Sequence, residues 1–131
     1  MTLHIFLLGA QRGCKFLGAL RRIEPERLWA AARADAAPWA FAVEPSAQHS
    51  DEQTLTASHS LMLPWIVAIV DKRTGSDSAS LRDVDLSTGW RVDQGTGQMR
   101  RYGGSQGVQP LSSWLPDEET AKGWQMVSGK K

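Results

Sequence analysis

The chain has 131 residues, enough for one domain with a core that needs no metal or disulfide. Fifteen basic and fourteen acidic side chains give a net charge of +1, which argues against nucleic acid or an anionic membrane as a partner. A single cysteine, Cys14, excludes an internal disulfide and a cysteine-based zinc site. It also favours a reducing compartment, so we expect a cytoplasmic protein. No stretch reaches the roughly 18 apolar residues of a membrane span.

Helices are predicted for the first part of the chain, over residues 11–37. The apolar residues 3–8 before them fit either a short strand or the first turn of a helix. Between residues 11 and 23, apolar side chains recur at steps of three and four, which predicts an amphipathic helix. A second helix is expected to begin at Glu24 and to end before Pro38.

An antiparallel sheet is predicted for residues 39–102. Residues 39–43 look like one strand, and the weak alternation of 54–60 fits an exposed one. The continuous apolar run 65–70 predicts a central strand that is covered on both faces, with Pro64 marking its beginning. Because both of its faces must be covered, we expect a homodimer formed through the sheet.

Three copies of Asp-x-x-Thr-Gly follow, at 71–75, 85–89 and 93–97. The aspartate can accept hydrogen bonds from the amides after it, and the glycine tolerates the positive φ that such hairpin loops need. The positions of their acidic side chains do not fit a calcium loop. Three loops in a row therefore predict a four-stranded meander, in which residues 90–93 form a short strand and 98–102 pair back on it.

Residues 103–131 are predicted to form a loop and a short helix that begins at Pro116 and ends at Gly123. Helices followed by an antiparallel sheet make an α+β domain. We expect a single domain, 1–131, with the N-terminal helices packed on the antiparallel β-meander.

The pattern of a strand, D-x-x-T-G, a strand and D-x-x-T-G again covers residues 65–102. It resembles the hairpins of small cystatin-like α+β domains, such as PepSY-like domains and the NTF2-fold immunity proteins. The resemblance implies a helix held by a curved antiparallel sheet and a role in binding. It assigns a function to no residue.

No set of residues converges on a catalytic or metal-binding pattern. Residues 9–15 differ from a phosphate loop in glycine spacing and lack its hydroxyl. His49 has Asp51 and Glu52 nearby but no second histidine close in the sequence. We therefore predict no catalytic residues, no metal and no cofactor, and we lean towards a protein that is not an enzyme.

A basic and aromatic cluster on the last predicted strands is the candidate binding site: Trp90, Arg91, Arg100, Arg101 and Tyr102. Aromatic and arginine side chains on a sheet can hold single-stranded nucleic acid. However, the adjacent Arg100 and Arg101 should point to opposite faces of a strand. Near-neutral net charge also weakens the electrostatic contribution to such binding.

Six tryptophans are unusual for this length, and most should lie in the core. One or two at the surface would mark a binding face. The leading hypothesis is a non-enzymatic protein of the inhibitor, immunity or adaptor type that binds a protein partner. Two alternatives stay open. One is a small-ligand-binding domain or enzyme with a helix–sheet cavity, using His59, Asp83 or Arg91. The other binds nucleic acid through the C-terminal strands.

Overall fold

The computed structural model describes residues 5–9, 26–45, 56–75, 80–103 and 111–130, and it has a mixed α+β fold. Its elements, in chain order, are β1 (Ile5–Gly9), a helix at 26–34, β2 (Ala40–Glu44), α2 (Thr56–Thr74), the 3₁₀ helix η2 (Leu86–Thr88), β3 (Trp90–Asp93), β4 (Met99–Arg101), β5 (Ser112–Leu115) and α3 (Glu118–Ser128). The apolar residues near the N-terminus thus form a strand.

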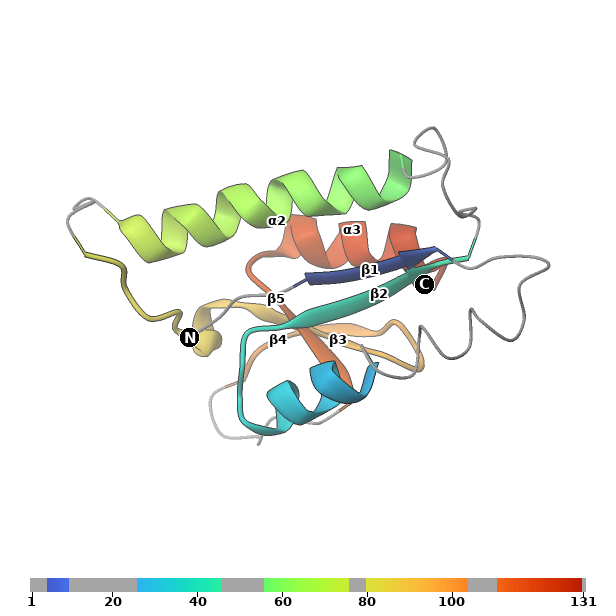
Figure 1. Cartoon of the computed structure of the whole chain (residues 1–131), viewed down its shortest axis with the longest axis horizontal. Helices are drawn as coiled ribbons and strands as arrows, with labels where there is room; N and C mark the ends of the chain where they lie inside the picture. The colour runs from blue at the N-terminus through green and yellow to red at the C-terminus, as the bar shows by residue number, and fades with distance from the viewer. Residues whose placement is uncertain (1–4, 10–25, 46–55, 76–79, 104–110, 131) are drawn as a thin grey trace.

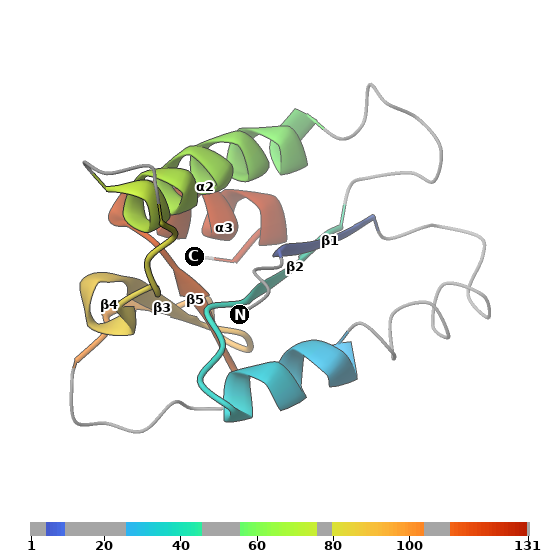
Figure 2. The same cartoon turned by 60° about the vertical axis from the view of Figure 1, so that its left-hand side comes forward.

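The strands form two separate sheets. β1 and β2 pair in parallel, from Ile5 opposite Ala40 onwards. β3 lies between β4 and β5 and is antiparallel to both. Figures 1 and 2 show α3 on one side of the β1–β2 pair and α2 beyond it, as the outermost element on that side. The helix at 26–34 lies on the opposite side of the pair.

A buried polar junction joins β2 to the three-stranded sheet. The Phe41 amide donates to the Ser113 hydroxyl at 2.9 Å, and that hydroxyl lies 3.1 Å from Oε1 of Gln94. The Phe41 carbonyl accepts from Nε1 of Trp124 at 2.8 Å and from Nε2 of Gln94 at 3.0 Å. Side chains of β5, α3 and the turn after β3 thus satisfy the backbone of β2 where no strand pairs with it.

Tryptophans fill much of the core. Trp29, Trp65, Trp114 and Trp124 are at most 5% exposed, as expected for most of the six. The ring of Trp29 lies 5.7 Å from that of Phe41, centroid to centroid, which places the helix at 26–34 against β2. The strand pair therefore has apolar side chains packed on it from both sides.

The strands predicted at 54–60 and 65–70 are wrong, because residues 56–60 and 65–70 belong to α2. A short continuous apolar run fits a buried strand or a buried helix equally well. Pro64, taken as the beginning of a strand, lies inside this helix, where it removes one intrahelical hydrogen bond. Leu61, Trp65 and Ile69 are spaced by four and are all buried, so their packing outweighs the cost of the proline.

Only one of the three Asp-x-x-Thr-Gly segments is a hairpin loop. Residues 93–97 join β3 to β4, with φ of +76° at Gly97. Residues 71–75 instead end α2, where Gly75 has φ of +55°. Residues 85–89 form η2, and Gly89 has φ of −101°, so the positive φ predicted there is wrong. The four-stranded meander is accordingly replaced by the three-stranded sheet.

Glycine is needed at position 89 because a larger side chain would clash there, and not because of the backbone angle. A Cβ atom at this position would come within 2.5 Å of the Trp114 ring. The Trp114 indole donates to the carbonyl of Leu86 at 3.0 Å, which fixes the ring against η2. Gly89, the second glycine of the repeated pattern, thus serves core packing.

Other predictions agree with the structure in part. The strands at 90–93 and 98–102 are confirmed as β3 and β4, whereas the strand at 39–43 exists as β2 but pairs in parallel. β5 was not predicted within 103–131, and α3 continues past Gly123 to Ser128. The predicted amphipathic helix at 11–23 lies outside the described residues. The packing of the N-terminal helices on the sheet therefore stays a prediction.

Candidate interaction surface

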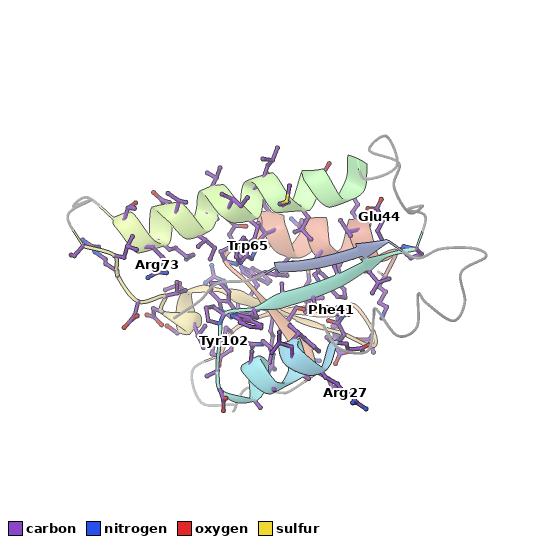
Figure 3. The ribbon with its side chains drawn as sticks, in the orientation of Figure 1. Arg27, Phe41, Glu44, Trp65, Arg73 and Tyr102 are labelled. Atoms are coloured by element: carbon purple, nitrogen blue, oxygen red, sulfur yellow. The ribbon has the colours of Figure 1, made fainter. Side chains whose placement is uncertain are left out.

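Helix α2 is apolar on two sides, and its inner side is packed. Leu61, Trp65 and Ile69 are between 0 and 5% exposed and belong to the main core. Figure 3 shows Trp65 projecting from α2 towards the strands. Gly123 of α3 lies opposite Leu61, and a Cβ built there would lie 3.4 Å from Leu61 Cδ1. An added methyl group there would make an ordinary van der Waals contact, so α3 packs against α2 without depending on glycine at this position.

The other apolar side of α2 is exposed. Four large aliphatic side chains lie on it: Leu63 (61% exposed), Ile66 (43%), Val67 (68%) and Val70 (54%). Their spacing of i, i+3, i+4 and i+7 puts them in one stripe along the helix. We call these four residues the outer face of α2. Side chains in Figure 3 project from this helix on the side away from α3.

The outer face of α2 carries no charge of its own. Residues 60–70 contain no acidic or basic residue. The first charges come at the C-terminal end, where Nζ of Lys72 donates to Oγ1 of Thr88 at 2.9 Å. Nε of Arg73 donates to the carbonyl of Arg82 at 3.2 Å. Both cations are therefore held against the 80–88 segment, whereas Asp71 is exposed.

The predicted binding cluster is brought together on β3 and β4, but it is divided between two faces. Trp90 pairs with Arg101, and Arg91 pairs with Arg100. The guanidinium of Arg101 lies 5.8 Å from the Trp90 ring centroid, within cation–π range. Arg100 and Arg101 are exposed, and Tyr102 and Trp90 are half-buried against the core. One face of the Trp90 ring is thus occupied within the chain.

Arg33 is fully buried and connects two backbone segments. Its Nε donates to the Ser112 carbonyl at 2.9 Å, and NH1 donates to the carbonyl of Ala37. Burial lowers the pKa of this guanidinium to about 10, an effect that the nearby Tyr102 partly offsets. The group stays charged at neutral pH, and its contacts give it the role of joining the end of the 26–34 helix to β5.

The aspartates of two repeated segments hold their turns as anions. Oδ1 of Asp93 accepts from the Thr96 amide at 2.7 Å, from the Thr96 hydroxyl at 3.0 Å and from the Gly95 amide at 2.9 Å. These bonds, the Thr96 amide above all, lower the pKa of Asp93. The hydroxyl and amide of Ser87 likewise lower the pKa of Asp85. Both carboxylates serve turn structure, and neither points to a ligand.

Within the described ranges, no three His, Cys, Asp or Glu side chains gather in a way that could hold a metal ion. In the same part of the chain, no helix combines the length and the apolar character needed to cross a membrane. The side chain of His59 and all of Cys14 and His49 lie outside the described residues. Asp83, proposed for a cavity, is exposed.

Comparison with protein-family models, with curated proteins and with solved structures gave no match. The resemblance to cystatin-like domains therefore stays a prediction. The outer face of α2 was missed from the sequence because residues 65–70 were interpreted with the period of a strand. At helical period, residues 61–70 contain a buried set at 61, 65 and 69 and an exposed set at 63, 66, 67 and 70. That second apolar set is the signal that could have revealed the surface.

Proposed function

We propose that this chain is a non-enzymatic binding protein of the inhibitor, immunity or adaptor type, and that the outer face of α2 contacts its protein partner. The observation that carries the proposal is a helix that is apolar on two opposite sides while the described residues pack against only one of them. A helix that is apolar all round is normally buried all round. A contiguous exposed apolar patch typically marks an interaction site.

The size of the outer face supports a contact of moderate strength. Burying a wholly exposed aliphatic side chain contributes roughly 1.5–3 kcal/mol. Scaled by the four exposed fractions, the stripe can contribute about 3–7 kcal/mol to association. The loss of translational and rotational freedom takes at least about 4 kcal/mol, so residues around the stripe must add to the contact.

An apolar helix face with i, i+3, i+4 and i+7 positions is also the pattern by which helices and apolar grooves recognise each other. The exposed residues Leu28, Leu81, Leu111 and Met126 lie elsewhere in the sequence and form no such series. The stripe is therefore a stronger candidate for a protein contact than the cluster on β3 and β4, where Arg101 already occupies the Trp90 ring. The nucleic-acid alternative gains no further support.

Two lysine substitutions at matched positions test the proposal. Val67 is 68% exposed on α2, and Met126 is 69% exposed on α3. Val67→Lys puts a charge in the middle of the stripe, whereas Met126→Lys puts the same charge on a different helix. Lysine is a good helix former, so neither change should unfold its helix.

The measurement is quantitative affinity capture from native extract with wild-type, Val67→Lys and Met126→Lys protein as bait. We expect the bound partner to be lost from Val67→Lys alone, because a desolvated ammonium would face an apolar contact. Equal recovery of the same partner by all three proteins would contradict the proposed surface.

A further inference from the structure

We infer that the occupant of the outer face of α2 is a second copy of this chain, whose α2 lies antiparallel to the first. This inference rests on the part of the proposed function that makes the outer face of α2 a protein contact, and it names the partner at that surface. It follows from the spacing of the stripe, from the charges at its ends and from the area that it offers.

The stripe of one α2 can pair with the same stripe of a second α2 that runs in the opposite direction. Its spacing of three, one and three residues is symmetric about the point between Ile66 and Val67. A two-fold axis through that point places Val67 beside Val67 of the second copy, and Ile66 beside Ile66. Leu63 then lies beside Val70 of the other helix. Such an isologous contact closes at two copies and pairs all four residues of the stripe.

The charges favour the antiparallel arrangement over the parallel one. Asp71, Lys72 and Arg73 all lie at the C-terminal end of α2, and residues 60–70 are uncharged. Lys72 and Arg73 are held against the 80–88 segment, so a parallel pair would bring mainly the two exposed Asp71 carboxylates near each other, which is unfavourable. An antiparallel pair separates them to opposite ends.

The area suits a weak dimer. The four exposed side chains span about 10 Å of a helix that is about 28 Å long. A stable interface needs about 800 Å² from each partner, more than such a short stripe supplies alone. We therefore expect a dimer that dissociates in the micromolar range.

Disulfide trapping tests the arrangement, with the full chain carrying Cys14→Ser so that only the introduced thiol reacts. Val67→Cys should form a covalent dimer on mild oxidation, because the two-fold axis brings this position close to its own copy. In Leu63→Cys the two thiols should be separated by about 10 Å along the axis, beyond the roughly 7 Å limit for a disulfide. Mixing Leu63→Cys with Val70→Cys should restore the cross-link. Cross-linking of Leu63→Cys alone as readily as Val67→Cys would overturn the antiparallel arrangement.

Sedimentation equilibrium on the uncross-linked protein tests the occupant. Wild type and Met126→Lys should dimerise with dissociation constants within about twofold of each other, and Val67→Lys should weaken dimerisation at least about tenfold. A wild-type monomer up to about 200 µM would overturn the inference. If the capture experiment still shows a different protein lost only from Val67→Lys, the proposed function stands and only the second copy is wrong. If wild type is monomeric and capture is also insensitive to Val67→Lys, both are wrong.

Discussion

Replacing Ser113 with alanine should destabilise the fold through the junction between β2 and β5. The hydroxyl is wholly buried, accepts from the Phe41 amide at 2.9 Å and lies 3.1 Å from Oε1 of Gln94. Alanine fits the space but leaves the buried amide without an acceptor. A buried polar group that loses its partner costs about 1–3 kcal/mol. Gln94 is half-buried and can turn to water, so its oxygen adds little. We therefore expect a loss of about 2–3 kcal/mol in the free energy of unfolding.

Urea denaturation at one fixed protein concentration measures this loss. With a slope of about 2 kcal/mol per molar, the midpoint should fall by about 1 M or slightly more while the slope is unchanged. Ser80→Ala is the control, because Ser80 is exposed and surface changes usually stay within about 0.5 kcal/mol. A midpoint for Ser113→Ala equal to that of Ser80→Ala would refute the role given to the junction.

Three further substitutions test the glycines and one turn. Gly123→Ala should stabilise α3 by up to about 1 kcal/mol and raise the Tm, because alanine favours a helix and its Cβ would make an ordinary contact with Leu61 at 3.4 Å. A lower Tm would contradict this and would mean that α2 and α3 leave no room for the added methyl group. Gly97→Ala should lower the free energy of unfolding in urea by about 1–3 kcal/mol or more, because φ is +76° and the new Cβ would lie 2.6 Å from the Cβ of Lys130. An unchanged free energy of unfolding would contradict this. Because turn hydrogen bonds lower the pKa of Asp93, its anion stabilises the fold above about pH 4, and that contribution is lost as the pH falls through the folded pKa. Between neutral and acidic pH, the free energy of unfolding should therefore fall less in Asp93→Asn than in wild type. An equal fall in both proteins would contradict this role of Asp93.

Local chemistry made the β3–β4 hairpin predictable. Trp90 and Val92 alternate with polar neighbours, and Asp93 and Gly97 supply the acceptor and the positive φ that the loop requires. The beginning of α3 was foreseen for a similar reason. Asp117 and Thr120 there form a capping box, which depends only on residues three apart. Elements that depend on a few neighbouring residues were therefore predicted correctly from the sequence.

Non-local packing decided the rest. The same Asp-x-x-Thr-Gly letters end a helix at Gly75 and close a hairpin at Gly97, because the flanking segments pack differently. β5 has the sequence Ser-Ser-Trp-Leu, which shows no strand alternation, and it is held by pairing with β3 and by the Phe41 junction. The parallel pairing of β1 and β2 joins residues more than thirty apart, which no local pattern encodes.

The candidate surface could be predicted only after α2 was known to be a helix. Trp90, Arg91 and Arg101 were correctly expected on neighbouring strands, but pairing divides them between two faces. The outer face of α2 needs both the helical period and the knowledge that α3 covers only the opposite side. The second condition is a property of the packed fold, and the sequence pattern of α2 does not contain it.

We propose that the outer face of α2 is covered when the protein is assembled. Thiol alkylation of Val67→Cys and Met126→Cys, each in the Cys14→Ser background, tests it most directly, because the two positions are 68% and 69% exposed in the single chain. We expect the thiol at position 67 to react more slowly as protein concentration rises and to regain its rate on dilution, while the thiol at position 126 reacts at a constant rate. Equal and concentration-independent rates at both positions would contradict it.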